Sequence, residues 1–271
     1  MTEQAVKIVF SDIDGTLLTD DKHTTPATER AVKGLLAQGI PFVLVSARMP
    51  EAIYPITLKW GLKTPVISYG GALVLTQQEE VLFDKRMARQ DTEGVIAAIK
   101  RERPQATINY YAGRHWYVEA VDERVQHEMD ITDATAEVVP FEALAERGES
   151  ASKVLVMGEP EDCSYLQQTL ANDFPSLNVV LSAPFLLEIM DMSVSKATGI
   201  EVMLKANGWR PEEALAFGDN FNDAEMLKYI PHSVVMGNAP EAVKKMGAAV
   251  TLTNEEDGIA HYLQKLGLVK L

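Results

Sequence analysis

Short apolar runs alternate with helix-like segments through the first part of the chain. Apolar runs of this length are typical of strands buried on both faces of a parallel sheet. The segments between them carry helix signals, such as the Thr25-Pro26 start and the Gly39 stop. We expect strands at 6–10, 40–45 and 65–68, and helices at 26–38 and 50–60. This alternation predicts parallel strands joined by helical crossovers.

The pattern changes after about residue 84. Two alternating runs around Gly113 indicate an antiparallel hairpin, and further short strands and helices follow it. In this middle segment we expect helices at 91–103 and 160–174, and strands at 107–111, 115–119, 153–157, 178–181 and 185–190. These elements predict a separate α+β unit.

The first pattern resumes at Lys196, with a helix to Asn207, a strand at 214–217, a helix from Asn222 and a strand at 233–236. Two more helices are expected near residues 241 and 258. We therefore predict an α/β protein. Its Rossmann-like core of parallel strands comes from 1–84 and 191–271, and an α+β domain over 85–190 is inserted into it.

Composition narrows the possible functions. The chain has 271 residues, 39 acidic and 25 basic, for a net charge of −14. A nucleic-acid binder presents clustered basic residues, and a membrane helix needs about 18 apolar residues in a row. Neither occurs, so nucleic acid and membrane are not expected partners. The lone Cys163 cannot form an internal disulfide, and the first residues lack the apolar core of a signal peptide. We expect a cytoplasmic protein.

Two acidic residues follow the first strand, in Asp12-Ile13-Asp14-Gly15-Thr16. Residues two apart on a strand share a face, so both carboxylates can point into the crevice at the carboxyl end of a parallel sheet. A calcium loop starting at Asp12 would need Gly and Glu where Leu17 and His23 stand. A catalytic pair and a turn with solvated aspartates remain open at this point.

A second apolar strand ends in carboxylates, at Asp219 and Asp223. Asn220 in this segment is read as a helix N-cap. Several aspartates at one sheet edge repel one another unless a hard cation lies among them, and Mg²⁺ prefers such oxygen ligands. The sequence therefore predicts a magnesium site. The five histidines have no ligand spacing, and no zinc is predicted.

Other residues suit a phosphate group. Ser46 after the second strand offers a hydroxyl, and the turn at Ala47-Arg48 offers a backbone N–H. Lys196 is expected at the start of a helix, where the helix dipole disfavours a positive charge. Because a lysine is unfavourable at this position, its presence there favours a functional role. A capping serine and an exposed lysine are the plain alternatives, and Arg48 fits either interpretation.

Four segments together resemble the motifs of the haloacid dehalogenase superfamily. They are Asp12 to Thr16, Ser46 to Arg48, Lys196 to Gly199 and Gly218 to Asp223. The chain is similar to Cof-type phosphatases with an α/β cap of the C2B type inserted between the second and third motifs (subclass IIB). Residues 181–190 resemble YidA-like sugar phosphatases. Ala47 stands where the family often has Gly, and Gly70, before Gly71, stands where it usually has Asn.

The resemblance implies a mechanism. Asp12 would be the nucleophile and Asp14 the general acid and base, and Mg²⁺ would be held by Asp12, Asp219 and the backbone carbonyl of Asp14. The phosphate would be held by the residues Ser46, Lys196, Asn222 and the amides of Ile13 and Ala47. Supporting roles fall to Asp223, Arg48, Gly70 and Gly71, with Asp223 orienting Lys196 or a metal-bound water.

The implied activity is Mg²⁺-dependent hydrolysis of small phosphorylated metabolites, above all sugar phosphates, by a monomer or homodimer. A phosphomutase on the same scaffold is one alternative. A catalytically weak phosphate-binding regulatory protein is another, although binding alone does not need the acid/base carboxylate of Asp14.

Overall fold

The computed structural model describes residues 6–270, and its backbone contacts divide them into two compact units. The first unit contains the described residues up to Arg48, Ile53–Phe83 and those from Ser195 onward. The second contains Met49–Ala52 and Asp84–Val194. The sequence-based limits lay at 84/85 and 190/191, and the short segment 49–52 was expected in the first unit.

The first unit is built on an eight-stranded sheet in the order β14-β13-β12-β1-β2-β3-β4-β5, within residues 6–270. The neighbours from β14 to β3 are parallel, and β4 is antiparallel to β3. The strands are β1 Ile8–Asp12, β2 Phe42–Val45, β3 Val66–Ser68, β4 Leu73–Leu75, β5 Val81–Asp84, β12 Ala214–Gly218, β13 His232–Val235 and β14 Ala249–Val250. Because β1 lies between β12 and β2, the expectation that both ends of the chain form one sheet is confirmed.

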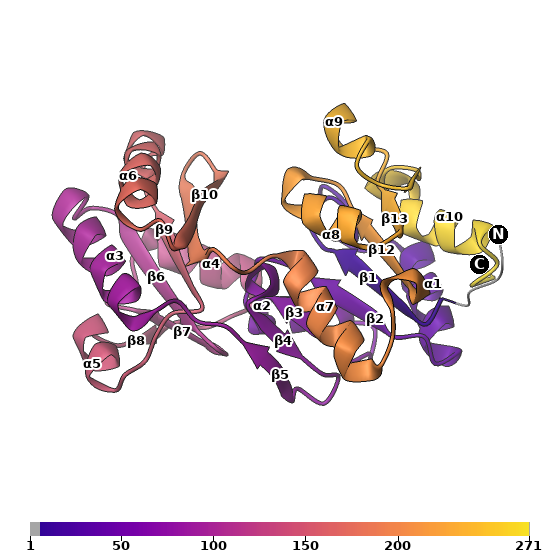
Figure 1. The fold of residues 1–271 in the computed structure, drawn as a ribbon, viewed down its shortest axis with the longest axis horizontal. Helices are drawn as coiled ribbons and strands as arrows, with labels where there is room; N and C mark the ends of the chain where they lie inside the picture. The colour runs from indigo at the N-terminus through magenta and orange to yellow at the C-terminus, as the bar shows by residue number, and fades with distance from the viewer. Residues whose placement is uncertain (1–5, 271) are drawn as a thin grey trace. The chain divides into compact units, whose positions relative to one another are not determined.

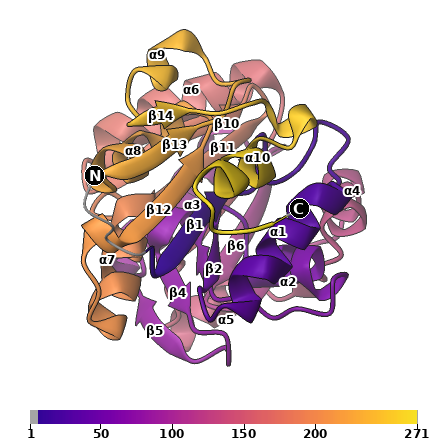
Figure 2. The ribbon, with the colours of Figure 1, turned by 90° about the vertical axis from the view of Figure 1, so that its right-hand side faces the viewer.

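Helices cover both faces of this sheet (Figures 1 and 2). Apolar residues of α7 and α8 pack on one face with Ile8, Phe10 and Ala216, while α1 and α10 lie side by side on the other. The helices are α1 Pro26–Ala37, α2 Pro50–Leu58, α7 Lys196–Asn207, α8 Ala224–Tyr229, α9 Glu241–Lys244 and α10 Gly258–Lys265, and the first residues of α2 belong to the second unit. All five residues of β1 are buried, as a strand covered on both faces requires.

Local capping sets the ends of two helices. The Thr25 side chain accepts the amide of Thr28 at the start of α1, as the Thr-Pro pair predicted. Helix α7 starts after the capping Ser195 and ends at Gly208 in the left-handed conformation. The helix expected from Asn222 begins instead as a 3₁₀ turn, Phe221–Asp223, which continues into α8. Other 3₁₀ turns lie at Tyr69–Gly71, Pro211–Glu213 and Asn254–Glu256.

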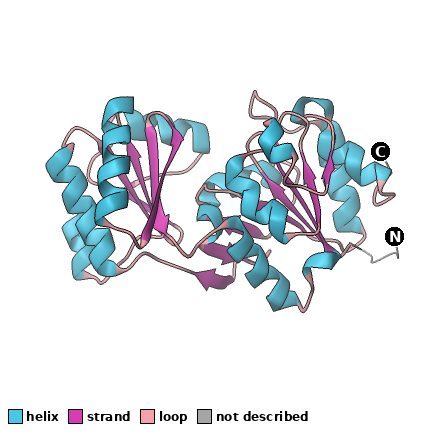
Figure 3. Cartoon of the chain, turned by 45° about the horizontal axis from the view of Figure 1, so that its top comes forward, coloured by secondary structure: helices cyan, strands magenta, loops and turns pink. Residues whose placement is uncertain are grey.

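The second unit has a six-stranded sheet in the order β10-β11-β9-β6-β7-β8, antiparallel except for β7–β8. Its strands are β6 Thr107–Ala112, β7 His115–Val118, β8 Glu137–Val138, β9 Lys153–Met157, β10 Leu177–Ala183 and β11 Leu186–Asp191. Its helices are α3 Arg89–Glu102, α4 Glu123–Thr132, α5 Phe141–Glu146 and α6 Pro160–Asp173. Helices α3 and α6 pack on one sheet face around one apolar cluster (Figure 3). The predicted α+β character is confirmed.

None of the helices within residues 6–270 combines the length and the apolar character needed to cross a membrane.

Candidate active site

Three neighbouring strands of the first unit deliver polar residues to one edge of the sheet. Asp12 is the last residue of β1, Ser46 follows β2 and Asp219 follows β12. The three strands are parallel neighbours in register, Asp12 opposite Val45 and Ser11 opposite Phe217. Their carboxyl ends therefore meet. Asp12 and Asp219 are only 5% and 9% exposed.

A buried lysine lies among the carboxylates. The Lys196 ammonium donates to Oδ1 of Asp12 and, at 2.5 Å, to Oδ1 of Asp223. Ligand oxygens of Asp12, Asp219 and Asp223 all lie within 4.8 Å of one another. We call Asp12, Asp219, Asp223 and Lys196 the buried side of the site.

Asp223 already uses both of its carboxylate oxygens within the protein. Its Oδ1 accepts from Lys196, and its Oδ2 accepts the amides of Asp219, at 2.9 Å, and Asn220, at 3.1 Å. Asp223 therefore holds both the Lys196 side chain and the backbone that follows β12. Asn222 is exposed in the turn beside it, and Asn220 caps that turn as predicted.

Two glycines allow the backbone to pass close to the carboxylates at this edge, and a threonine donates a hydrogen bond to one of these carboxylates. A Cβ on Gly15, which has φ +82°, would lie 2.4 Å from Oδ2 of Asp219, and one on Gly218 would lie 2.8 Å from Asp223. Thr16 donates its hydroxyl to Oδ1 of Asp219 at 2.7 Å. Thr16 was not predicted as a site residue from the sequence, although it is part of the first acidic segment.

The buried side carries more negative charge than Lys196 balances. Burial raises the pKa of Asp12 above its usual range, because desolvation outweighs the attraction of Lys196, and Asp223 and Asp219 add to the rise. Burial also raises the pKa of Asp219 to about 6, and Asp223 adds to that rise while the Thr16 hydrogen bond opposes it. A divalent cation relieves this repulsion, and carboxylate oxygens are the donors that Mg²⁺ prefers. The residues present thus fit a magnesium ion.

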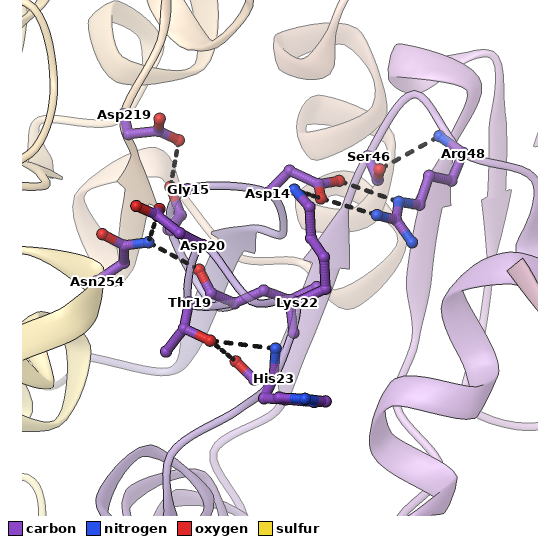
Figure 4. A network of polar contacts seen from close by, with 12 residues as sticks. Asp14, Gly15, Thr19, Asp20, Lys22, His23, Ser46, Arg48, Asp219 and Asn254 are labelled. Atoms are coloured by element: carbon purple, nitrogen blue, oxygen red, sulfur yellow. Dashed lines mark hydrogen bonds and ion pairs between the residues drawn. The ribbon is translucent and has the colours of Figure 1, made fainter. Parts of the chain in front are cut away.

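The second acid of the segment lies in different surroundings. The Asp14 carboxylate accepts from Nε of Arg48 at 3.0 Å, from Nη2 of Arg48 at 2.7 Å and from the Lys22 ammonium at 2.9 Å (Figure 4). Burial acts to raise its pKa, but the two cations hold the pKa below the usual range. We call Asp14, Arg48 and Lys22 the open side of the site. Lys22 was not predicted as a site residue from the sequence.

Because the Asp14 carboxylate is turned toward Arg48 and Lys22, it is not part of the carboxylate cluster found within the described residues. That Asp14 offers a cation its backbone carbonyl stays a prediction.

The Ser46–Arg48 turn is held by the loop after β3. Ser46 is buried, its hydroxyl accepts the amide of Arg48 at 3.2 Å, and its carbonyl accepts the amide of Gly70 at 2.9 Å. Gly70 has φ 61° and ψ 19°, a conformation that Asn adopts more readily than other side chains, so Gly fits where the family usually has Asn. A Cβ on Gly71 would lie 1.9 Å from the carbonyl oxygen of Ser195, at the start of α7.

Ile13 and Ala47 are the two residues that were expected to bind the phosphate through their backbone amides. Ile13 is buried, and its carbonyl accepts the amides of Leu17 and Leu18 at 3.0 and 2.9 Å, which closes a tight turn after β1. Ala47 lies partly buried between Ser46 and Arg48.

A parallel α/β sheet that gathers carboxylates, a lysine and a serine at one edge has the groups to bind a cation together with a small anion at the place where such sheets bind ligands. Comparison with known proteins identifies the family. The model of the haloacid dehalogenase-like hydrolases matches residues 9–263. The chain belongs to this family, and it is a phosphoric monoester hydrolase of the Cof type, as the resemblance of its four motifs implied.

Individual relatives agree over almost the whole chain. A Haemophilus influenzae protein named "Putative phosphatase" is 35% identical over 260 residues, which covers 96% of this chain and 97% of the relative. A Bacillus subtilis 5-amino-6-(5-phospho-D-ribitylamino)uracil phosphatase is 28% identical, covering 95% of this chain and 96% of that protein. The crystal structure of a haloacid dehalogenase-like hydrolase from Bacteroides thetaiotaomicron has a TM-score of 0.87 at 26% identity, with 96% and 99% covered.

Proposed function

We propose that this phosphatase hydrolyses small sugar phosphates with Mg²⁺ through a phosphorylated Asp12. The observation that carries the proposal is the buried cluster of three carboxylates around Lys196 at the carboxyl edge of the parallel sheet. The substrate class is supported by a relative at 28% identity whose name gives a phosphorylated ribityl compound as its substrate.

In the first step, a carboxylate oxygen of Asp12 attacks phosphorus and the bond from phosphorus to the leaving oxygen breaks. Arg48 and Lys22 lower the pKa of Asp14 in the free protein, so in this proposal the substrate draws these cations away and Asp14 takes up the proton that it gives to the leaving oxygen, and the alcohol leaves neutral. In the second step, the Asp14 carboxylate takes a proton from water, and the water oxygen attacks phosphorus. The bond to Asp12 then breaks, which releases phosphate and restores the carboxylate.

The phosphoryl oxygens need donors while this happens. Lys196 supplies a positive charge next to Asp12, and Ser46, Asn222 and the amides of Ile13 and Ala47 supply hydrogen bonds. Asp223 acts by holding Lys196 and the amide of Asp219, since both of its oxygens are engaged there.

Asp12, Asp219 and the backbone carbonyl of Asp14 would hold the Mg²⁺ ion. When bound, this ion shields the charge between the carboxylate and the phosphate and stabilises the equatorial oxygens.

The two units divide the work in this proposal. The first unit carries the residues that take part in the reaction. The second unit, whose bounds are close to the predicted 85–190, acts as a cap that selects the leaving group. This division explains why the four motifs fall in the first unit.

A hydrolysis screen tests the proposal. Phosphate release is measured with sugar phosphates, nucleotides and p-nitrophenyl phosphate, with Mg²⁺ and with excess chelator. We expect the highest kcat/KM among the sugar phosphates and loss of turnover with chelator. Full turnover in chelator contradicts the magnesium requirement. Recovery of the phosphate on another carbon of the sugar, rather than free in solution, identifies a mutase instead.

A further inference from the structure

We propose that Lys22 and Arg48 form a subsite for a second anionic group, a carboxylate or a phosphate, on the leaving group of the substrate. This inference rests on the proposed function and deepens it, because it selects among phosphate esters those whose leaving group is itself charged. The first observation is the convergence of both cations on one oxygen, Oδ1 of Asp14.

The charges on the open side do not cancel. Arg48 and Lys22 bring two positive charges to the single negative charge of Asp14, and like charges this close repel one another unless an anion bridges them. Asp14 provides one such anion. A second anionic group from the substrate would complete the balance, and the guanidinium of Arg48 has the planar fork that suits carboxylate and phosphate oxygens.

The open side is accessible, unlike the buried side. The side chains of Lys22, Asp14 and Arg48 are 61%, 39% and 26% exposed. In the proposed mechanism Asp14 protonates the leaving oxygen, so the cations bonded to Asp14 lie beside the leaving group rather than beside the transferred phosphoryl group.

The backbone that presents Lys22 is unusual. Lys22 has φ 61°, in the left-handed region that costs a residue with a side chain about 1–2 kcal/mol. Two contacts hold its turn. The amide of Lys22 donates to the carbonyl of Thr19 at 2.9 Å, and the Thr19 hydroxyl accepts the amide of His23 at 3.1 Å.

A distant residue braces the same turn. The buried Asn254 donates from Nδ2 to the carbonyl of Leu18 at 3.0 Å and to Oδ1 of Asp20 at 3.2 Å (Figure 4). An ordinary surface ion pair contributes only about 0–1 kcal/mol and does not need such a support. A turn that is strained, braced and aimed at the proposed general acid indicates a functional lysine.

The test compares matched substrates. Glycerol 3-phosphate and 3-phosphoglycerate differ by a terminal alcohol against a carboxylate, and glucose 6-phosphate and glucose 1,6-bisphosphate differ by a second phosphate. We measure kcat/KM for all four with Mg²⁺, and the preference is the ratio within each pair. The wild type is expected to prefer the charged member of at least one pair. In Lys22→Gln that preference falls about tenfold, as the loss of one charge-assisted hydrogen bond implies.

Two further variants act as controls. Lys63→Gln removes another lysine of the first unit with the same 61% exposure and a carboxylate partner, and its preference should equal that of the wild type. Lys22→Arg keeps the charge and should retain the preference.

Two results separate the two proposals. Equal preference in Lys22→Gln and wild type, with all substrates hydrolysed, overturns the subsite but leaves the phosphatase mechanism intact. Failure of the wild type to hydrolyse any of the four substrates with Mg²⁺ present contradicts the proposed function itself.

Discussion

Asp12 and Asp14 lie two residues apart, yet the protein places them in opposite surroundings. The buried side encloses Asp12 with two more carboxylates and one lysine, and burial raises the pKa of Asp12. The open side leaves Asp14 partly exposed between two cations that lower its pKa. In the free protein these shifts are opposite to the proposed tasks, because a nucleophile needs a low pKa and a general acid a high one. Mg²⁺ beside Asp12 and a substrate anion that engages Arg48 and Lys22 would each reverse one of them. We propose that the buried side carries the general chemistry and the open side meets the variable part of the substrate.

The largest expected effect is on the buried side. Asp12→Asn removes the attacking oxygen anion while keeping the size of the side chain, so kcat/KM should fall by about 10⁴-fold or more. Phosphate release from the best substrate of the screen measures the effect, and circular dichroism checks the fold. Asp21→Asn, at an exposed aspartate of the first unit, is the matched control and should keep wild-type turnover. Substantial turnover in folded Asp12→Asn would mean that another group attacks phosphorus.

The two lysines, Lys196 and Lys22, should differ in how much they contribute to stability. Lys196→Met leaves Asp12 and Asp223 buried without their shared cation, and breaking a buried pair in this way costs about 3–5 kcal/mol. Lys22→Gln breaks an exposed pair and should cost at most about 1 kcal/mol. The free energy of unfolding from urea titration, without Mg²⁺, measures both. Equal losses in the two variants would contradict the division into a buried and an open side.

The buried side was largely predictable from the sequence. The buried strand β1 ends at Asp12, and a strand of this pattern in a parallel sheet delivers its last residue to the carboxyl edge. Lys196 was recognisable because a cation at a helix N-terminus opposes the helix dipole. In the structure Asp12 and Asp223 both accept hydrogen bonds from Lys196, and their negative charges offset the unfavourable interaction of the lysine with the helix dipole.

The open side was not predictable in the same way. Lys22 reaches Asp14 only because its turn is left-handed and is braced by Asn254, more than 200 residues away in the chain. Such a contact leaves no periodic pattern. Helix α4 was missed for a related reason: of its residues, only Val125 is buried, so the apolar signal is weak.

A smaller effect, which depends on the leaving group, is expected on the open side. Asp14→Asn removes the proton donor, which should lower kcat/KM for sugar phosphates by about 10²–10⁴-fold. The loss in kcat/KM should be much smaller for p-nitrophenyl phosphate, because nitrophenolate leaves without a proton. The contrast is measured in kcat/KM, which covers the steps up to release of the leaving group, because the hydrolysis of phosphorylated Asp12 is common to both substrates. An equal loss on the two would show that Asp14 does not act as the acid.

The smallest effect concerns the link between Thr16 and Asp219. Thr16→Val removes the hydrogen bond to Oδ1 of Asp219 with little change in volume. Because a hydrogen bond to a charged group contributes about 1.5–3 kcal/mol, the Mg²⁺ concentration for half-maximal activity should rise roughly tenfold or more. An unchanged Mg²⁺ requirement would mean that Thr16 does not orient this carboxylate for the metal.

Trapping the phosphorylated enzyme tests the covalent role of Asp12. Asp14→Asn is mixed with excess p-nitrophenyl phosphate and Mg²⁺, quenched in acid within the first turnover, and digested for mass spectrometry. The variant lacks the base that activates water, so the phosphorylated enzyme should accumulate, with the phosphoryl group on the peptide that contains Asp12. Release of nitrophenol with the Asp12 peptide unmodified, or with the phosphoryl group on another residue, would contradict the account.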